Sequence, residues 1–313
     1  MSAAAAARKQ IICVGHAALD DVFAVDSWPA NSGKIAAHGF TRSGGGMAAN
    51  AASAIARLGG EAVFWGPTGE DPVADAIRES LIDEGVDVHG LRRFAGRTSS
   101  HSAVIVDQRG ERLVVGYRGS ALEVSADWLP LEQIRCAAAL LADVRWPDGA
   151  LVALHAARNA GIPAVLDAEI APVQTIELLA AAASHVVFSE RGLEACCGRD
   201  SAAGLRGMLE HGALMAAVTR GAAGVDWVEA TGPGKLLHCP AFPVDTVDTL
   251  GAGDVFHGAY TLALAEGRLI GEAIRFAAAA AAIKCSRPGG RSGTPNRSEV
   301  ETFLASAGMK PRD

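Results

Sequence analysis

Short apolar runs alternate with longer amphipathic stretches along most of the chain. The short runs predict buried strands at residues 11–14, 62–65, 138–142, 164–167 and 185–188. The longer stretches predict helices at residues 48–58, 72–84, 149–160, 175–183, 252–266 and 270–284. Because strands and helices follow one another in this way, the pattern favours an α/β fold with a mostly parallel sheet covered by helices on both faces.

Three segments instead show the pattern of paired strands. They predict hairpins at residues 21–25 with 34–40, 102–107 with 112–117, and 216–228. Since a single hairpin is marginally stable, we expect the first two to join in one small sheet that forms a lid. The expected organisation is one domain at residues 11–308, with the lid at about 16–40 and 98–118, between a disordered tail at 1–10 and a second tail at 309–313.

Composition and charge exclude several classes of partner. Half of the 313 residues are hydrophobic and 20% are charged, which suits a buried core. The net charge of -7 comes without a basic stripe, so we expect no nucleic-acid partner. No apolar run approaches the ~20 residues of a membrane span, so we expect no membrane partner. The six cysteines show no ligand cluster and the N-terminus resembles no secretory signal, which together indicate a cytoplasmic protein with reduced thiols.

The most informative stretch runs from Asp248 to Asp254 and leads directly into a predicted helix. The small residues Gly251, Ala252 and Gly253 allow backbone N–H groups to converge at the helix N-terminus, which is a place for an anion. Asp254 falls in the first turn, where the helix dipole favours an ionised carboxylate that can accept a proton. An ordinary capped helix start with a solvated carboxylate would also fit these residues.

This heptapeptide resembles the second signature of the ribokinase-like carbohydrate kinases, the PfkB family. The resemblance implies that Asp254 is the catalytic base and that the backbone of Gly251, Ala252 and Gly253 forms the anion hole for the transferred phosphoryl group. It also implies a ribokinase-like three-layer α/β/α fold with a small β-sheet lid, and the cofactors ATP and Mg²⁺.

Other segments resemble the same family in the same order, from about Ile11 to Leu304. The first signature lies at residues 45–50 and a family turn at 66–71. The resemblance assigns the sugar site to Asp20, Gly45, Gly46 and Asn50, and the nucleotide site to Ser189, Thr219, Gly221, Gly224, Lys284 and Cys285. Each residue alone could be a cap or a turn residue, so it is their shared order that carries the resemblance.

One family motif is altered in this chain. Where many members have Asn-x-x-Glu, residues 189–192 read Ser-Glu-Arg-Gly. This change leaves Glu190 as the candidate Mg²⁺ ligand.

Several segments, among them 141–146 and 284–291, resemble the bacterial sulfofructose kinases within this family. The resemblance implies phosphorylation of 6-deoxy-6-sulfofructose on O1, with Lys34 and Arg145 binding the sulfonate. A guanidinium offers paired donors to such a tetrahedral anion and an ammonium offers a point charge. The asparagine expected as a third contact is Gly116 here, and Arg118 is the candidate that replaces it.

Alternatives remain open for these residues. Lys34 could be a solvated hairpin residue and Arg145 an ion-paired residue at a strand end. Gly116 favours a kinase of fructose or a related ketose, and the altered motif at 189–192 would suit a regulator that binds sugar or nucleotide without turnover. Because many family members dimerise through their lids, the resemblance also implies a homodimer.

Overall fold

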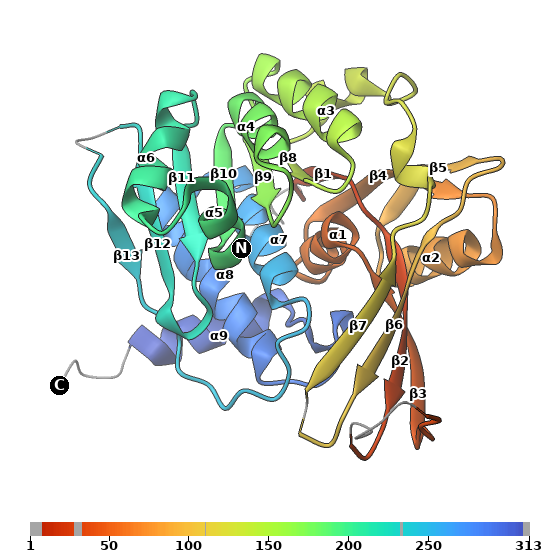
Figure 1. Cartoon of the computed structure of the whole chain (residues 1–313). Helices are drawn as coiled ribbons and strands as arrows, with labels where there is room; N and C mark the ends of the chain where they lie inside the picture. Colours follow the sequence, from red (N-terminus) through yellow and green to blue (C-terminus); the bar gives the residue numbers. More distant parts are fainter. Residues whose placement is uncertain (1–7, 28–32, 110, 232–233, 309–313) are drawn as a thin grey trace, which may run out of the picture.

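A nine-stranded sheet forms the centre of the computed structural model, which describes residues 8–27, 33–109, 111–231 and 234–308 (Figure 1). The strand order is β13-β12-β11-β10-β9-β8-β1-β4-β5. The seven strands from β11 to β5 are parallel, while β12 and β13 are antiparallel at one edge. The strands are β1 (Gln10–Val14), β4 (Glu61–Gly69), β5 (Asp87–Phe94), β8 (Ala139–Asp143), β9 (Ala164–Ala168), β10 (His185–Ser189), β11 (Met215–Thr219), β12 (Val225–Glu229) and β13 (Leu237–Cys239).

Helices cover both faces of this sheet, as the sequence pattern predicts (Figure 1). Neighbouring residues of a strand point to opposite faces, so Ile11 packs with α1, α2, α7 and α8 while Ile12 packs with α3, α4, α5 and α6. The helices are α1 (Met47–Arg57), α2 (Pro72–Asp83), α3 (Pro147–Asn159), α4 (Val173–Ala182), α5 (Glu190–Cys197), α6 (Ser201–Glu210), α7 (Ala252–Ala265), α8 (Ile270–Cys285) and α9 (Arg297–Gly308).

A second sheet of four strands, ordered β3-β2-β6-β7, forms the lid beside the main sheet (Figure 1). Its central pair, β2 and β6, is parallel and the outer pairs are antiparallel. The two predicted hairpins therefore do join in one sheet. The strands are β2 (Ala18–Ala24), β3 (Gly39–Gly45), β6 (Ser100–Val106) and β7 (Arg112–Tyr117).

The prediction of a strand at 34–40 is wrong, since β3 begins only at Gly39. Strand β2 extends inward to Ala18, which pairs with Gly45, so its partner strand must reach the glycines that the sequence places in a loop. The lid therefore extends to residue 45 instead of ending at about 40. The family turn predicted at 66–71 is also in part strand, because β4 continues to Gly69.

The limits of the domain differ slightly from the prediction. Gln10, expected in the N-terminal tail, opens β1 and pairs with Glu61. Residues 1–7 of the tail predicted at 1–10, the predicted tail at 309–313, and Gly110 in the second hairpin lie outside the described residues. Within the part of the chain that is described, no helix has both the length and the apolar character that crossing a membrane requires.

Close packing of α1 on α7 brings two parts of the predicted site together. Helix α1 is rich in alanine, and Gly258 of α7 lies against it so closely that an added Cβ would be 2.6 Å from the carbonyl oxygen of Ala51. Small residues on both helices thus permit an approach that larger side chains would block. As a consequence, Asn50 on α1 and Asp254 on α7 come within hydrogen-bond distance.

Candidate active site

Asp254 stands at the start of α7, where the chain turns sharply into the helix. Gly251 has a φ of 74°, a left-handed conformation that glycine adopts without strain, and the N–H of Ala252 closes the turn on the carbonyl of Thr249 at 3.2 Å. The N–H groups of the next residues belong to the first helical turn, where no carbonyl of the helix can accept them. The predicted anion hole thus has the geometry of an open helix N-terminus.

The carboxylate of Asp254 is held by Asn50, whose Nδ2 donates to Asp254 Oδ2 at 2.6 Å. Burial, and after it repulsion from Asp167, raise the pKa of Asp254 to about 7, although the hydrogen bond from Asn50 and the nearby His257 act to lower it. At neutral pH the group is therefore partly ionised. A carboxylate with this pKa can take up a proton from a substrate hydroxyl group.

The other predicted sugar-site residues gather around Asn50. Asp20, on β2, is half-buried, and burial raises the pKa of its carboxyl group despite the hydrogen bond from Ser102. Gly45 faces this carboxylate so closely that any Cβ would overlap it. Gly46 precedes α1 with a φ of 91° and lies against the carbonyl of His16. The glycines of the first signature therefore serve close approach and a positive φ.

Arg291 completes this cluster and is absent from the residues that sequence reasoning assigned to the site. Its side chain is buried, and it donates to Asn50 Oδ1 at 2.7 Å, to the carbonyl of Gly45 at 2.9 Å and to Ser80 Oγ at 3.2 Å. A Cβ on Gly44 would overlap the guanidinium. No local pattern announces these contacts, because Arg291 and Asn50 are 241 positions apart in the sequence.

His257 supports the anion hole from inside the protein. Its Nδ1 lies 2.7 Å from the carbonyl oxygen of Gly253, which can only accept, so this nitrogen carries the proton and donates. Its Nε2 lies 3.3 Å from the carbonyl of Val187 and 3.4 Å from Asp167 Oδ1. Burial lowers the pKa of His257 and raises that of Asp167 well above its usual range.

Asp143, at the end of β8, is a second residue that sequence reasoning missed. It is fully buried and accepts three backbone N–H groups, from His16 at 2.8 Å, Ala48 at 3.0 Å and Arg145 at 2.8 Å. One carboxylate thus joins the end of β1, the start of α1 and the segment that carries Arg145. Such a network fixes the edge of the sheet around the site.

Two of the three residues predicted to bind an anionic group lie together. Arg118, in the segment after β7, donates to the carbonyl of Arg145 at 2.6 Å, and Arg145 donates to the carbonyl of Ile170 at 3.0 Å. Burial is the main cause that lowers the pKa of the nearby His16, and both guanidinium groups lower it further. Lys34 is exposed and contacts no polar partner among the described residues. The structure does not bring it to the arginine pair.

Gly116 lies on β7 opposite Ser102, and the space in front of it is open. The nearest atom to an added Cβ would be Ser102 Oγ, at 3.8 Å. The position could hold the asparagine of the expected pattern without steric conflict, so the absence of that donor is a chemical difference and not a packing necessity.

The predicted nucleotide residues lie at the carboxyl ends of β10 and β11. Ser189 caps α5 by accepting from the N–H of Gly192 at 3.0 Å, and it donates to Glu169 at 3.0 Å. Thr219 ends β11, and the turn that follows includes two glycines with positive φ, 53° at Gly221 and 89° at Gly224. These residues face the same edge of the sheet from which α7 begins.

Lys284 and Cys285, at the end of α8, contact the segment that leads to α7. Lys284 is fully buried, and its ammonium donates to the carbonyl of Asp248 at 2.8 Å and lies 3.4 Å from the carboxylate. The carbonyl of Cys285 accepts from the N–H groups of Val247 and Asp248. The ammonium of Lys284 is therefore directed onto the loop before the anion hole and not toward solvent. Arg112 of the lid strand β7 pairs with the same Asp248.

The acidic residues around the site suit a magnesium ion that arrives with phosphate groups. The described residues contain no group of three or more histidine, cysteine or acidic side chains that could hold a metal by themselves. Glu190 is exposed and pairs with Arg220 at 3.0 Å. Because Mg²⁺ keeps several waters and is often bound through one or two carboxylates and the substrate phosphates, the carboxylate of Glu190 is of a kind that fits it once it leaves Arg220.

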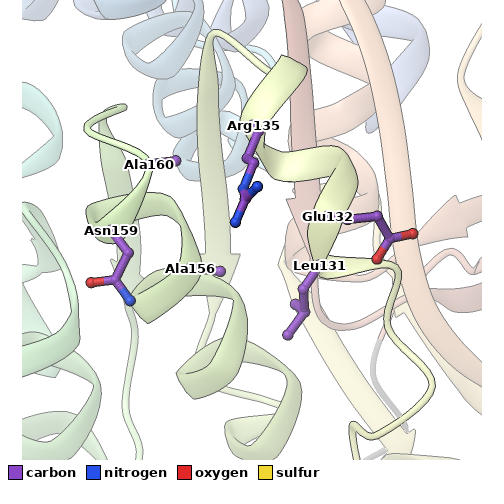
Figure 2. Close-up of a pocket in the computed structure, with 6 residues that line it drawn as sticks. All are labelled: Leu131, Glu132, Arg135, Ala156, Asn159 and Ala160. Atoms are coloured by element: carbon purple, nitrogen blue, oxygen red, sulfur yellow. The ribbon is translucent and has the colours of Figure 1, made fainter.

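A surface pocket of about 340 Å³ lies apart from this site, between α3 and the short 3-10 helix η2 (Leu131–Cys136). Figure 2 shows Arg135 directed into the space between the two helices and Glu132 turned away from it. None of the predicted site residues lines this pocket. The complete lining consists of Leu131, Glu132, Arg135, Ala156, Asn159 and Ala160.

Comparison with known proteins shows the family to which the chain belongs. The family model described as pfkB family carbohydrate kinase matches residues 8–297. The ATP-dependent ribose-1-phosphate kinase of Halopiger xanaduensis is 30% identical over 95% of this chain and 98% of its own length. The ketohexokinase of Mus musculus is 29% identical over 90% of this chain and 97% of its own length.

Solved structures show the same fold. A protein of Agrobacterium tumefaciens assigned as a ribokinase has a TM-score of 0.92 with 38% identity, over 97% of this chain and all of the other. The ribokinase of Thermotoga maritima has a TM-score of 0.83 with 28% identity, over 95% and 99% of the two chains. The family match and the fold are those of a carbohydrate kinase, a phosphotransferase that acts on an alcohol group. The chain belongs to the pfkB family of carbohydrate kinases, and its fold is ribokinase-like.

Proposed function

We propose that the protein transfers the γ-phosphoryl group of ATP to a hydroxyl group of a ketose, with Asp254 as the general base. The observation that carries this proposal is the position of Asp254, in the first turn of α7 and with a pKa of about 7. A base with a pKa near neutrality is ionised often enough to act and basic enough to accept a proton.

The proposed reaction uses few groups. Asp20, Gly45, Gly46 and Asn50 hold the sugar, and Asp254 takes the proton of one hydroxyl group as its oxygen attacks the γ-phosphorus. The bond from this phosphorus to the bridging oxygen breaks, and ADP leaves. The backbone of Gly251, Ala252 and Gly253 at the start of α7 stabilises the charge on the transferred group, and the N–H of Ala252 takes part only when it leaves the carbonyl of Thr249. Mg²⁺, when bound with ATP, supplies further positive charge to the phosphates.

We assign the nucleotide to the carboxyl ends of β10 and β11. Ser189, Thr219, Gly221 and Gly224 supply polar groups and an open backbone there, and Cys285 lies at the end of α8 behind the phosphate loop. Lys284 acts from beneath this loop through Asp248. Glu190 is the proposed protein ligand for a water of the Mg²⁺ ion.

The substrate we propose is 6-deoxy-6-sulfofructose, converted to its 1-phosphate. The proximity of Arg118 and Arg145 supports an anionic substrate, because two guanidinium groups at one edge of the site favour a tetrahedral anion. Lys34 would join them only if the lid brings it closer. A relative that acts on ribose 1-phosphate is consistent with an anionic sugar. The donor that is missing at Gly116 instead favours fructose or another neutral ketose.

The test is ADP release by the purified protein with Mg-ATP and equal concentrations of 6-deoxy-6-sulfofructose, fructose or ribose 1-phosphate. We expect the sulfonated sugar to be preferred. Arg145→Ala should raise the KM for 6-deoxy-6-sulfofructose more than tenfold, because a lost charge-assisted contact costs about 1.5 to 3 kcal/mol. The KM for fructose should remain nearly unchanged. Arg199→Ala is a matched control, because this side chain is 93% exposed and pairs only with Glu194 in the described residues.

Each other outcome assigns a different function. Preference for fructose or ribose 1-phosphate, with no effect of Arg145→Ala, would contradict the sulfonate proposal but not the kinase assignment. Nucleotide binding without ADP release on any sugar would favour the regulator.

We also propose that the chain forms a homodimer through its lid and works in the cytoplasm. The lid presents several exposed apolar side chains that a partner could cover. They are Phe40 (56% exposed), Leu113 (49%), Val114 (55%), Val115 (59%) and Tyr117 (59%). All six cysteines are free, which suits a reducing compartment.

A further inference from the structure

We propose that Arg291 is a positioning residue for catalysis: by binding Asn50 Oδ1 it fixes the Asn50 amide so that Nδ2 faces Asp254. The chain of contacts runs from Arg291 Nε to Asn50 Oδ1 at 2.7 Å and from Asn50 Nδ2 to Asp254 Oδ2 at 2.6 Å. The inference rests on the proposed role of Asp254 as base, and it gives Asn50 a task beyond contact with the sugar.

The donors and acceptors of Arg291, Asn50 and Asp254 allow one orientation of the Asn50 amide. A guanidinium has donors only, so the atom of Asn50 that faces Arg291 must be the carbonyl oxygen. The amide nitrogen then faces Asp254, and as a donor it requires an acceptor there. The ionised carboxylate is an acceptor at both oxygens, so this arrangement favours the form of Asp254 that can take up a proton.

Arg291, the first residue in this series of hydrogen bonds, is held rigidly. Arg291 is 5% exposed, and its two terminal nitrogens are occupied by the carbonyl of Gly45 and by Ser80 Oγ. Gly44 leaves just enough room for the guanidinium, because a Cβ there would overlap it. Burial lowers the pKa of Arg291 to about 10, which still leaves the group charged at neutral pH. The amide of Asn50 is therefore held by a fixed, positively charged donor.

The other groups that act on Asp254 come from three elements and mostly oppose ionisation. Asp167 on β9 and, to a smaller extent, Asp143 on β8 repel the carboxylate, whereas His257 on α7 acts in the opposite sense. Arg291, on the loop after α8, is the further cation coupled to Asp254. Without Arg291 the amide could rotate and present its carbonyl oxygen to Asp254, which would favour the protonated and inactive form.

The experiment is a pH titration of the Asp254 carboxyl carbon by NMR, identified by its absence from Asp254→Asn. In Arg291→Met we expect the midpoint to rise by about one pH unit, as the loss of an oriented hydrogen bond to a charged group predicts. The acidic limb of kcat against pH should move by the same amount, with little change in the KM for ATP. Arg287→Met is the matched control, because Arg287 pairs with Glu299 and should leave the titration unchanged.

A second pair of variants tests the same series of hydrogen bonds at Asn50 and with a conservative change of Arg291. These variants keep the inference testable even if Arg291→Met does not fold. Asn50→Leu should raise the titration midpoint of Asp254 by a similar amount. Arg291→Lys, which keeps one donor, should raise this midpoint by less. In the Asn50→Leu background, Arg291→Lys, which keeps the positive charge, should have no further effect on the midpoint. An unchanged midpoint in Arg291→Met, or additive effects in the double variant, would overturn the inference. Full activity in Asp254→Asn would instead contradict the proposed function.

Discussion

The charged carboxylate of Asp254 lowers the free energy of unfolding, and a variant without this charge allows the effect to be measured. In the proposed reaction Asp254 acts as a base only when its carboxyl group is charged, yet burial makes this charged form unfavourable. Asparagine has nearly the same shape and no charge. We therefore expect Asp254→Asn to abolish turnover, by a factor of about 10² to 10⁴, and at the same time to make the folded protein more stable.

The size and the pH dependence of this gain follow from the pKa of Asp254. A rise from the ordinary value of 3.8 to about 7 corresponds to about 4 kcal/mol at pH values above both. Because Asp254 is only half-buried and Asn50 binds a carboxylate better than an amide, we expect about 1 to 2 kcal/mol. As the pH rises through this interval, the unfolded chain ionises before the folded one does. Stability of the wild-type protein is therefore lost from about pH 4 to about pH 7.

The assay is urea unfolding of wild-type protein and Asp254→Asn from about pH 5 to about pH 8. The difference between the two should grow with pH and become constant above the pKa of Asp254. Asp245→Asn, a change at an exposed carboxylate in the preceding loop, should show no such trend. A variant that is less stable at pH 8, or a difference that does not change with pH, would refute this reasoning.

Three further predictions concern residues outside the catalytic pair. Asp143→Asn should destabilise the fold by about 3 kcal/mol, because an amide cannot accept all three N–H groups that the carboxylate accepts, and an unchanged urea midpoint would contradict this. Lys284→Met should lower the stability by about 2 kcal/mol by leaving the Asp248 loop without its buried donor, whereas Lys235→Met, at an exposed position, should leave the melting temperature unchanged. Val115→Glu should convert the proposed dimer to a monomer in sedimentation experiments, and Leu178→Glu, at another exposed apolar position, should not; a wild-type protein that sediments as a monomer would disprove the dimer.

The candidate site residues whose positions in the fold could be predicted are those with a local pattern. The motif at 248–254 and the helix after it lie within a few residues of one another, and the structure places Asp254 in the first turn as expected. Asp20, Gly45 and Asn50 do meet, although their assignment to the sugar remains a prediction. The central sheet follows from runs of apolar residues that are buried on both faces.

The parts that could not be predicted depend on distant partners or on weak patterns. Arg291 and Asp143 act through residues 241 and 95 to 127 positions away, and neither has a distinctive neighbour pattern. Strand β5 carries charged residues on an edge, and β13 has three residues, so apolar periodicity does not reveal them. Strand β3 ends in glycines that suit a loop, and only pairing with β2 makes them extended.

The bond between Arg291 and Asn50 also has a consequence during synthesis. The ribosome produces the chain from its N-terminus, so Asn50 is synthesised 241 residues before its partner Arg291. A nascent chain can form the early strands and helices, but it lacks the last anchor of the site. Chains truncated before Arg291 would therefore be without an oriented base, and phosphoryl transfer would begin only when translation is nearly complete.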